Sequence, residues 1–194
     1  MNDEWRDDVS KRIRFEVEAG FTTHDEDIVA STVDLLMEEG IDRTELRSAA
    51  VRALVEARKA HGIAERNYPA TTDFDRLTRA FDDLEDRGVV ARHDFTCCQT
   101  CGRAEIEDEM DAVRTTGKTV RGYAFYHTQD TERAIDGDGL MLSYGSIEDD
   151  DEESVRVGEM IVGALKRVGL APEWDGDLNS RIIVAMDWKR RTAS

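Results

Sequence analysis

The sequence has few of the features that mark membrane spans, disulfide scaffolds or flexible linkers. Its 194 residues include only two prolines and three cysteines. No apolar run approaches the roughly 20 residues that a membrane-spanning helix needs. The N-terminus is acidic and lacks the apolar stretch of a secretory signal. These absences argue against a membrane or secreted protein, and we expect a cytoplasmic one.

Basic side chains are also scarce. The chain has 43 acidic and 26 basic residues, which gives a formal charge of −17. Residues 1–88 hold 22 acidic and 13 basic side chains, and residues 89–194 hold 21 and 13. Such a field repels phosphate backbones and anionic lipid surfaces. We therefore expect no nucleic-acid or membrane partner. The expected partner is a protein or a small molecule, and a homodimer stays open as an alternative.

The apolar residues are periodic and divide the chain into two regions. Up to residue 88 they repeat at helical spacing, as in Val9, Ile13 and Val17. The densest acidic run, residues 149–153, is interpreted as a solvated loop. After residue 88 the pattern predicts strands near 89–95, 120–127, 140–145 and 181–188, with helices after the first and third strands.

This order, β-α-β-β-α-β, is that of a ferredoxin-like fold. We therefore expect an α+β protein in which an N-terminal helical region, residues 1–88, packs on a four-stranded ferredoxin-like sheet. Residues 89–194 would form an α/β sandwich domain, and the two regions would pack as one unit. In that topology the first two strands are parallel, and the third strand lies between them.

All three cysteines, Cys97, Cys98 and Cys101, lie within five residues. An odd number so close together is no disulfide framework. Cys98 and Cys101 have the spacing of half a zinc knuckle, so zinc is a candidate cofactor, with Cys97, His93 or His127 completing a tetrahedron. A CxxC between a strand and a helix also fits thiol redox chemistry. The third interpretation is that the cysteines only pack in the core.

A second polar segment follows the second predicted strand. It contains His127, Gln129, Asp130 and Glu132, which we add to the candidate site. In the expected topology both segments lie at one edge of the sheet, about 10 Å apart. His127 fits either a metal ligand or a satisfied core histidine, and Asp130 also fits a helix N-cap.

The strings CCQTCG, GYAFYHTQDTE, LMLSYG and DWKRR resemble a family of uncharacterised bacterial proteins, mainly actinobacterial. The resemblance runs from about residue 70 to residue 191. It implies one continuous module with a site at 97–101 and 127–132. Because that family has no assigned activity, the resemblance implies no reaction.

The sequence favours a non-catalytic binding or interaction module, with zinc as a candidate structural metal. The alternative is a small enzyme that uses a Cys/His/Asp site for thiol redox or metal-assisted chemistry. The sequence contains no nucleophile-elbow, phosphate-binding-loop or zincin motif. It therefore does not decide whether the chain is an enzyme.

Overall fold

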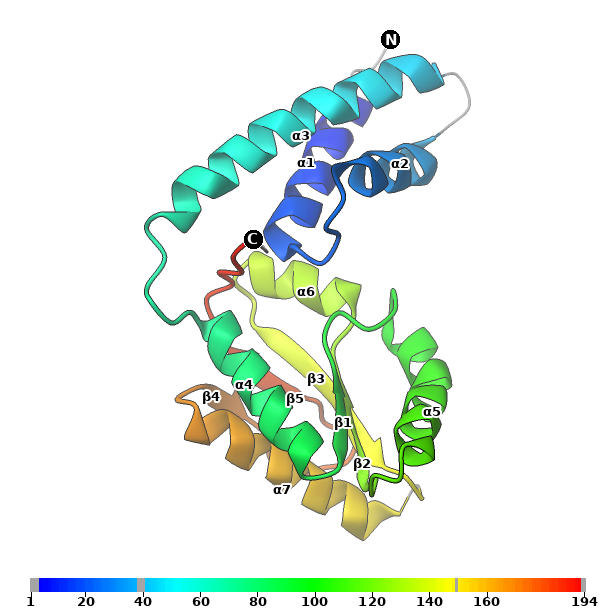
Figure 1. Ribbon diagram of the computed structural model, residues 1–194, viewed down its shortest axis with the longest axis vertical. Coiled ribbons are helices and arrows are strands. Elements are labelled where there is room, and N and C mark those ends of the chain that lie inside the picture. Colours follow the sequence, from blue (N-terminus) through cyan, green and yellow to red (C-terminus); the bar gives the residue numbers. More distant parts are fainter. Residues whose placement is uncertain (1–3, 38–40, 149, 193–194) are drawn as a thin grey trace. The chain divides into compact units, whose positions relative to one another are not determined.

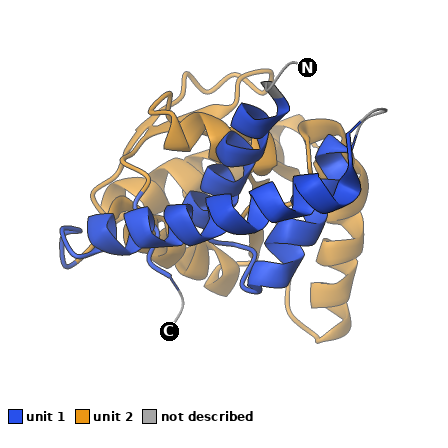
Figure 2. Cartoon of the chain, turned by 90° about the horizontal axis from the view of Figure 1, so that it is seen from above, with its two compact units in different colours: residues 1–70, 189–194 blue, residues 71–188 orange. Residues whose placement is uncertain are grey.

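The computed structural model describes residues 4–37, 41–148 and 150–192. The chain divides into two compact units (Figure 2). Unit 1 comprises residues 1–70 and 189–194, and unit 2 comprises residues 71–188. This boundary differs from the expected one at residue 88. The described residues form seven helices and five strands, so the α+β class is confirmed.

Unit 1 is a small helical assembly. Its helices are α1 (Glu4–Ala19), α2 (Asp25–Leu36) and α3 (Arg43–Glu65). The predicted stripe of α1 forms a buried core with Ile28 and Leu46. The helical N-terminal region was therefore predicted correctly from the 3.6-residue period.

The C-terminal segment belongs to this helical unit, although it follows the last strand of unit 2. The Arg190 guanidinium lies 3.9 Å from the centre of the Phe21 ring. Its Nη1 donates a hydrogen bond to the backbone oxygen of Ala19 at 3.1 Å. The backbone N–H of Thr192 donates to Oε1 of Glu65 at 3.0 Å. These contacts explain why residues 189–194 group with residues so distant in sequence.

Unit 2 is a five-stranded mixed sheet with four helices (Figure 1). Its elements are α4 (Asp73–Asp86), β1 (Val89–Arg92), α5 (Gln99–Thr115), β2 (Gly122–Phe125), α6 (Thr128–Ile135), β3 (Leu140–Ser146), α7 (Asp151–Arg167), β4 (Ala171–Glu173) and β5 (Ile182–Ala185). The spatial order of the strands is β1-β2-β3-β5-β4.

The ferredoxin-like topology is wrong. β1 and β2 are parallel, as expected, but they pair directly, with Val89 opposite Gly122. β3 pairs antiparallel with the other edge of β2 and does not lie between them. A split arrangement does occur at the other side of the sheet, between β3 and β4. These two strands are parallel to each other, and β5 lies between them and pairs antiparallel with both. A β-α-β unit has the same element order whether its two strands pair directly or leave room for a third strand between them, so periodicity could not separate the two arrangements.

The fifth strand, β4, was missed because it contains Pro172. Proline cannot donate to a strand ladder, and we interpreted its surroundings as a loop. β4 is three residues long and lies at the edge of the sheet. Edge positions tolerate proline, and the missing donor also protects the edge from pairing with another chain.

Two helices, α4 and α7, cover one face of the sheet, and α5 covers β1 and β2 on the other (Figure 1). Both faces of β2 show this arrangement. A side chain at Gly122 would meet Val157 of α7, whereas Phe125 packs against Gly102 of α5. α4 was expected in the helical region, but its buried face, which includes Phe81, packs on the sheet of unit 2.

The acidic run also differs from its interpretation as a loop. Asp150 is the N-cap of α7, and its side chain accepts a hydrogen bond from the backbone N–H of Glu153 at 2.8 Å. Asp151, Glu152 and Glu153 form the first helical turn. Carboxylates are stabilised there by the helix dipole. Asp149 lies outside the described residues.

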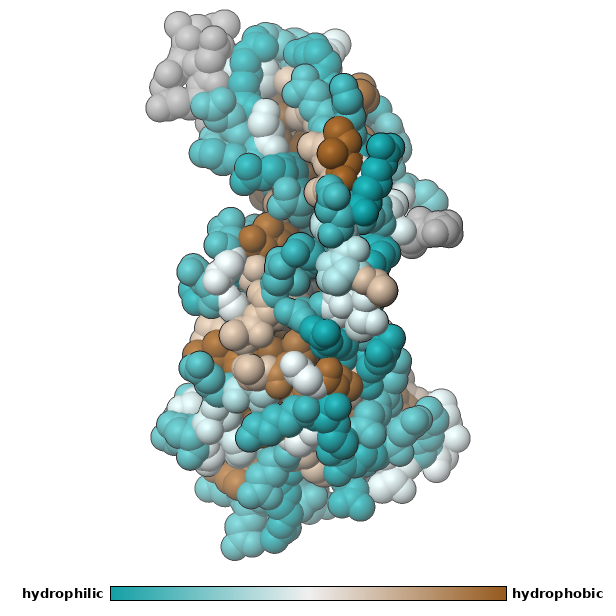
Figure 3. All heavy atoms as spheres, turned by 90° about the vertical axis from the view of Figure 1, so that its left-hand side faces the viewer, coloured by the Kyte–Doolittle hydropathy of each residue, from teal (hydrophilic) through white to brown (hydrophobic). Residues whose placement is uncertain are grey.

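The surface agrees with the composition. The face drawn in Figure 3 is mainly hydrophilic. Some large apolar side chains are nevertheless exposed, among them Leu35, Val55 and Ile63 of unit 1. None of the described helices combines the length and the apolar character needed to cross a bilayer.

We predict opposite effects for two glycine substitutions. A Cβ at Gly122 would lie 2.2 Å from the backbone oxygen of Gly145, so Gly122→Ala should lower the free energy of unfolding by about 1–3 kcal/mol. Gly62 lies within α3 with nothing within 4 Å of an added Cβ. Gly62→Ala should therefore raise stability by about 0.5–1 kcal/mol. Urea unfolding of both variants tests this, and destabilisation by Gly62→Ala would contradict it.

Candidate metal centre

The three cysteines lie where β1 passes into α5, in an irregular loop. Asp94 and Thr96 have positive φ angles of 46° and 64°. This region is uncommon for residues other than glycine and strained for a β-branched one. The Thr96 hydroxyl donates to the backbone oxygen of Cys98 at 3.1 Å. The turn places Cys98 at the N-cap of α5, with Cys101 in the first turn.

The sulfur atoms of Cys97, Cys98 and Cys101 all lie within 4.8 Å of one another. We call this group the thiol triad. The Cys97 and Cys101 sulfurs are 3.6 Å apart, in a thiol–thiol hydrogen bond. Zn–S bonds of about 2.3 Å place two sulfurs of a tetrahedral site roughly 3.8 Å apart. The triad is therefore already close to the size that one metal ion requires.

The electrostatics of the triad favour one thiolate. The backbone N–H and the thiol of Cys101 lower the pKa of Cys98, with smaller help from Cys97 and the backbone of Thr100. Hydrogen bonds to Cys97 and Cys98, together with the charge of those sulfurs, raise the pKa of Cys101 to about 11. A metal that binds all three sulfurs must displace these protons, so its affinity rises with pH.

Two of the other candidate residues, His127 and Asp130, form a buried ion-pair network with Arg181. Asp130, only 1% exposed, accepts hydrogen bonds at 2.9 and 2.5 Å from Nη1 and Nη2 of Arg181. The same carboxylate lies 3.0 Å from Nε2 of His127 and 3.1 Å from its backbone N–H. Arg181 also donates to the backbone oxygen of Met141 at 2.6 Å. The network therefore joins α6 to β3 and to the start of β5.

His127 is held as a neutral ring. Burial lowers its pKa, an effect that the charge of Asp130 opposes and that of Arg181 reinforces. Since Nε2 faces a carboxylate, it carries the proton, and Nδ1 has no hydrogen-bond partner among the described residues. The group of metal-ligand atoms formed by the triad does not include His127.

The first turn of α6 also holds the cysteine loop. Thr128 donates to the backbone oxygen of Thr96 through its N–H at 3.2 Å and its hydroxyl at 3.0 Å. The Thr131 hydroxyl donates to Oδ1 of Asp94 at 2.6 Å. Asp94 and Thr96, the two residues with positive φ angles, therefore both accept hydrogen bonds from α6. The segment after β2 supports the triad, because direct pairing of β1 and β2 brings the two loops together.

The group of possible metal ligands among the described residues includes none of the other three candidates. Gln129 and Glu132 are exposed on α6. His93 lies 2.8 Å from the Tyr126 hydroxyl through Nδ1, and its ring stacks on Phe81 at 4.5 Å between centroids. Sequence reasoning missed Arg181 entirely, because an arginine at the start of a predicted strand carries no signal of a buried partner.

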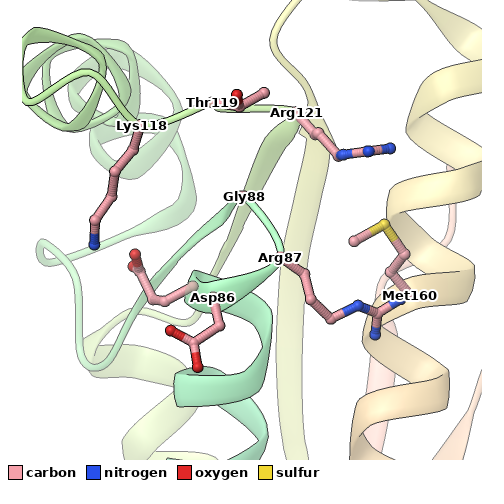
Figure 4. A pocket seen from close by; sticks show the side chains of 8 residues that line it. Asp86, Arg87, Gly88, Lys118, Thr119, Arg121 and Met160 are labelled. Atoms are coloured by element: carbon pink, nitrogen blue, oxygen red, sulfur yellow. The ribbon is translucent and has the colours of Figure 1, made fainter.

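A surface cavity of about 630 Å³ lies elsewhere in unit 2 (Figure 4). Its lining includes Arg87 and Gly88 before β1, and Lys118 and Arg121 before β2. The triad follows β1, so the cavity is at the opposite end of these strands. Asp86 carries an opposite charge into the same lining, and Figure 4 shows Lys118 pointing toward the acidic side chains. Its mixed charge indicates no particular ligand.

We expect Asp130→Asn to destabilise unit 2 strongly. The change leaves Arg181 without a counter-charge in a position where its side chain is 16% exposed. Breaking a buried pair in this way costs about 3–5 kcal/mol. Asp138→Asn, an exposed change after the same helix, is the matched control. Chemical denaturation measures both, and equal small effects would contradict a central role for Asp130.

The lowered pKa of His127 predicts a pH dependence of stability. In the unfolded chain the ring binds a proton as pH falls through about 6.5, whereas the folded state resists protonation. Stability contributed by His127 should therefore be present above that pH and decline below it. His127→Gln keeps an N–H donor for Asp130 and removes the titration. Unfolding free energies from pH 8 to 5 should fall less steeply for this variant, and identical slopes would refute the assignment.

Comparisons with known proteins give one match. A family model described as a domain of unknown function, DUF6891, matches residues 2–192. No curated protein and no solved structure matches the chain. Since the family model spans nearly the whole sequence, the chain belongs to the DUF6891 family, whose function is unknown.

Proposed function

We propose that this protein is a metal-binding module that holds zinc through Cys97, Cys98 and Cys101. The observation that carries the proposal is the convergence of three sulfur atoms within 4.8 Å. Three thiols gathered this closely would repel one another once ionised, and a bound divalent cation removes that repulsion. Thiolate is also a preferred ligand of zinc.

Zinc takes four ligands, and the triad supplies three. Cys97 is exposed and the other two cysteines are partly exposed, so the metal would face solvent. The two nearby histidines are committed elsewhere, His127 to Asp130 and His93 to Tyr126. The fourth position is therefore open to water or to a group from a protein or small-molecule partner.

The binding module is favoured over a small enzyme with a Cys/His/Asp site. Such an enzyme would need His127 or Asp130 to reach a substrate at the triad. His127 is 4% and Asp130 1% exposed, and both are occupied in the network with Arg181. Their arrangement supports a structural role.

Two further parts of the proposal follow from the same site. The triad must stay reduced to bind metal, which supports a cytoplasmic location. The strings CCQTCG and YHTQDTE contain the triad and the helix turn that holds its loop. We propose them as the signatures of this mainly actinobacterial family.

Metal analysis tests the proposed function. Protein purified without a histidine tag and loaded with zinc should retain about one equivalent after dialysis, as measured by mass spectrometry of the metal. Substitution with Co²⁺ should give the intense charge-transfer absorption of cobalt–thiolate bonds. Each of Cys97→Ser, Cys98→Ser and Cys101→Ser should weaken binding, because each removes a sulfur ligand.

The matched control is Thr100→Ser, an exposed change within the same segment that keeps every thiol. It should bind zinc as the unchanged protein does. Failure of the unchanged, fully reduced protein to retain zinc would sink the proposal. Retention of a full equivalent by all three serine variants would place the metal elsewhere.

A further inference from the structure

We propose that the thiol triad is also a site of reversible disulfide formation, in which Cys101 pairs with Cys97 or Cys98 and the metal is released. The release of metal rests on the proposed function. The formation of the disulfide does not, because it depends only on the positions of the thiols.

The distances favour bridges that include Cys101. Its sulfur lies 3.6 Å from that of Cys97 and within 4.8 Å of that of Cys98. A disulfide bond is about 2.05 Å long, so side-chain rotations that shorten the sulfur–sulfur distance by roughly 1.5 to 3 Å would close either pair. Cys98 is the N-cap of α5 and Cys101 lies in its first turn, and residues three apart at the start of a helix lie on one face. Cys97 precedes the helix, and its thiol already contacts that of Cys101.

The remaining pair, Cys97 with Cys98, is disfavoured by the backbone. The two sulfurs also lie within 4.8 Å of each other, but a disulfide between adjacent residues closes an eight-membered ring that contains the peptide bond joining them. A bridge between neighbours would have to distort the peptide that joins them. Cys101 is therefore the common member of every disulfide that the observed backbone accommodates.

The site is accessible to an oxidant. Cys97 is exposed, and Cys98 and Cys101 are partly exposed. A small disulfide such as glutathione disulfide can reach an exposed thiol without unfolding of the chain. The loop before the triad holds Asp94 and Thr96 in strained conformations, a feature that recurs at switching segments.

The chemistry balances with glutathione disulfide as the oxidant. A cysteine thiolate of the triad attacks one sulfur of glutathione disulfide, and a glutathione thiolate leaves. A second cysteine of the triad loses its proton and attacks the mixed disulfide, which releases a second glutathione. Two protein thiols are oxidised, one glutathione disulfide is reduced to two glutathiones, and the two protons pass to the solvent or the leaving thiolates.

Metal binding and disulfide formation exclude each other. The sulfurs of a disulfide are no longer thiolates, so oxidation leaves the metal one ligand of three. By linkage, bound zinc must protect the thiols from oxidation to the same extent that oxidation weakens zinc binding. The triad would then report the thiol–disulfide balance of its surroundings through its metal content.

The test begins with reduced, metal-free protein treated with glutathione disulfide. Alkylation and mass spectrometry should show that two of the three thiols are lost and that no glutathione stays attached. Cys97→Ser and Cys98→Ser should each lose both remaining thiols, since each keeps a pair with Cys101. Cys101→Ser should instead accumulate glutathione adducts. Cys101→Ala provides a second variant if the serine variant misfolds, and circular dichroism checks the fold of each.

The proposal is overturned if Cys101→Ser closes an internal disulfide as readily as the unchanged protein. Glutathione adducts alone, or disulfide-linked dimers, in the unchanged protein would overturn it as well. A second arm treats zinc-loaded protein and follows released zinc with a colorimetric chelator. Zinc should appear in step with thiol loss, and a reducing agent should restore binding. Zinc retained on oxidised protein refutes the switch, whereas reduced protein that never binds zinc refutes the proposed function and leaves the first arm readable.

Discussion

The arrangement around the triad depends on one buried negative charge, the carboxylate of Asp130. Burying a carboxylate is costly unless its oxygens are paired and hydrogen-bonded. Here two guanidinium nitrogens of Arg181, the ring of His127 and a backbone N–H satisfy it. Because Arg181 also binds the backbone of Met141, this single charge fixes the start of α6 against two strands.

The anchored turn of α6 in turn holds the strained cysteine loop. Positive φ angles at Asp94 and Thr96 cost of the order of 1–3 kcal/mol each. Thr131 and Thr128 donate hydrogen bonds to these two residues, and such bonds offset part of that cost. The strain is therefore maintained by contacts outside the cysteine motif. A site held this way keeps its sulfurs close before any metal arrives.

Sequence reasoning recovered the parts of this arrangement that local patterns encode. Helical periodicity located α1 and α4, and the clustered cysteines identified the metal-ligand candidates. It failed where the answer depends on distant partners. Direct pairing of β1 with β2 has the same element order as the split topology, and a proline concealed β4.

The candidate site shows the same limit. His127 and Asp130 were singled out as residues that could act beside the thiols, and their place next to the cysteine loop follows from parallel strands. Their partner Arg181 lies 51 residues from Asp130 in sequence. Without that partner, a buried network and a reactive dyad look alike, since both need a histidine and a carboxylate at close spacing.

The strong negative charge of the protein acts on the charge of a cation, whereas the thiol triad acts on its preference for sulfur ligands. A charge of −17 attracts cations of every kind toward the protein. Its many carboxylates are hard oxygen ligands, which prefer calcium and magnesium. The three thiols are the chain's only cysteine sulfurs, and thiolates select zinc and other soft ions. The overall field can therefore speed the arrival of a cation, but selectivity for a soft metal must come from the triad itself. When two of those sulfurs form a disulfide, the site loses its selectivity for soft metals, but the electrostatic field of the whole protein hardly changes. Oxidation of the triad would therefore control which metal binds and would leave the general attraction of cations intact.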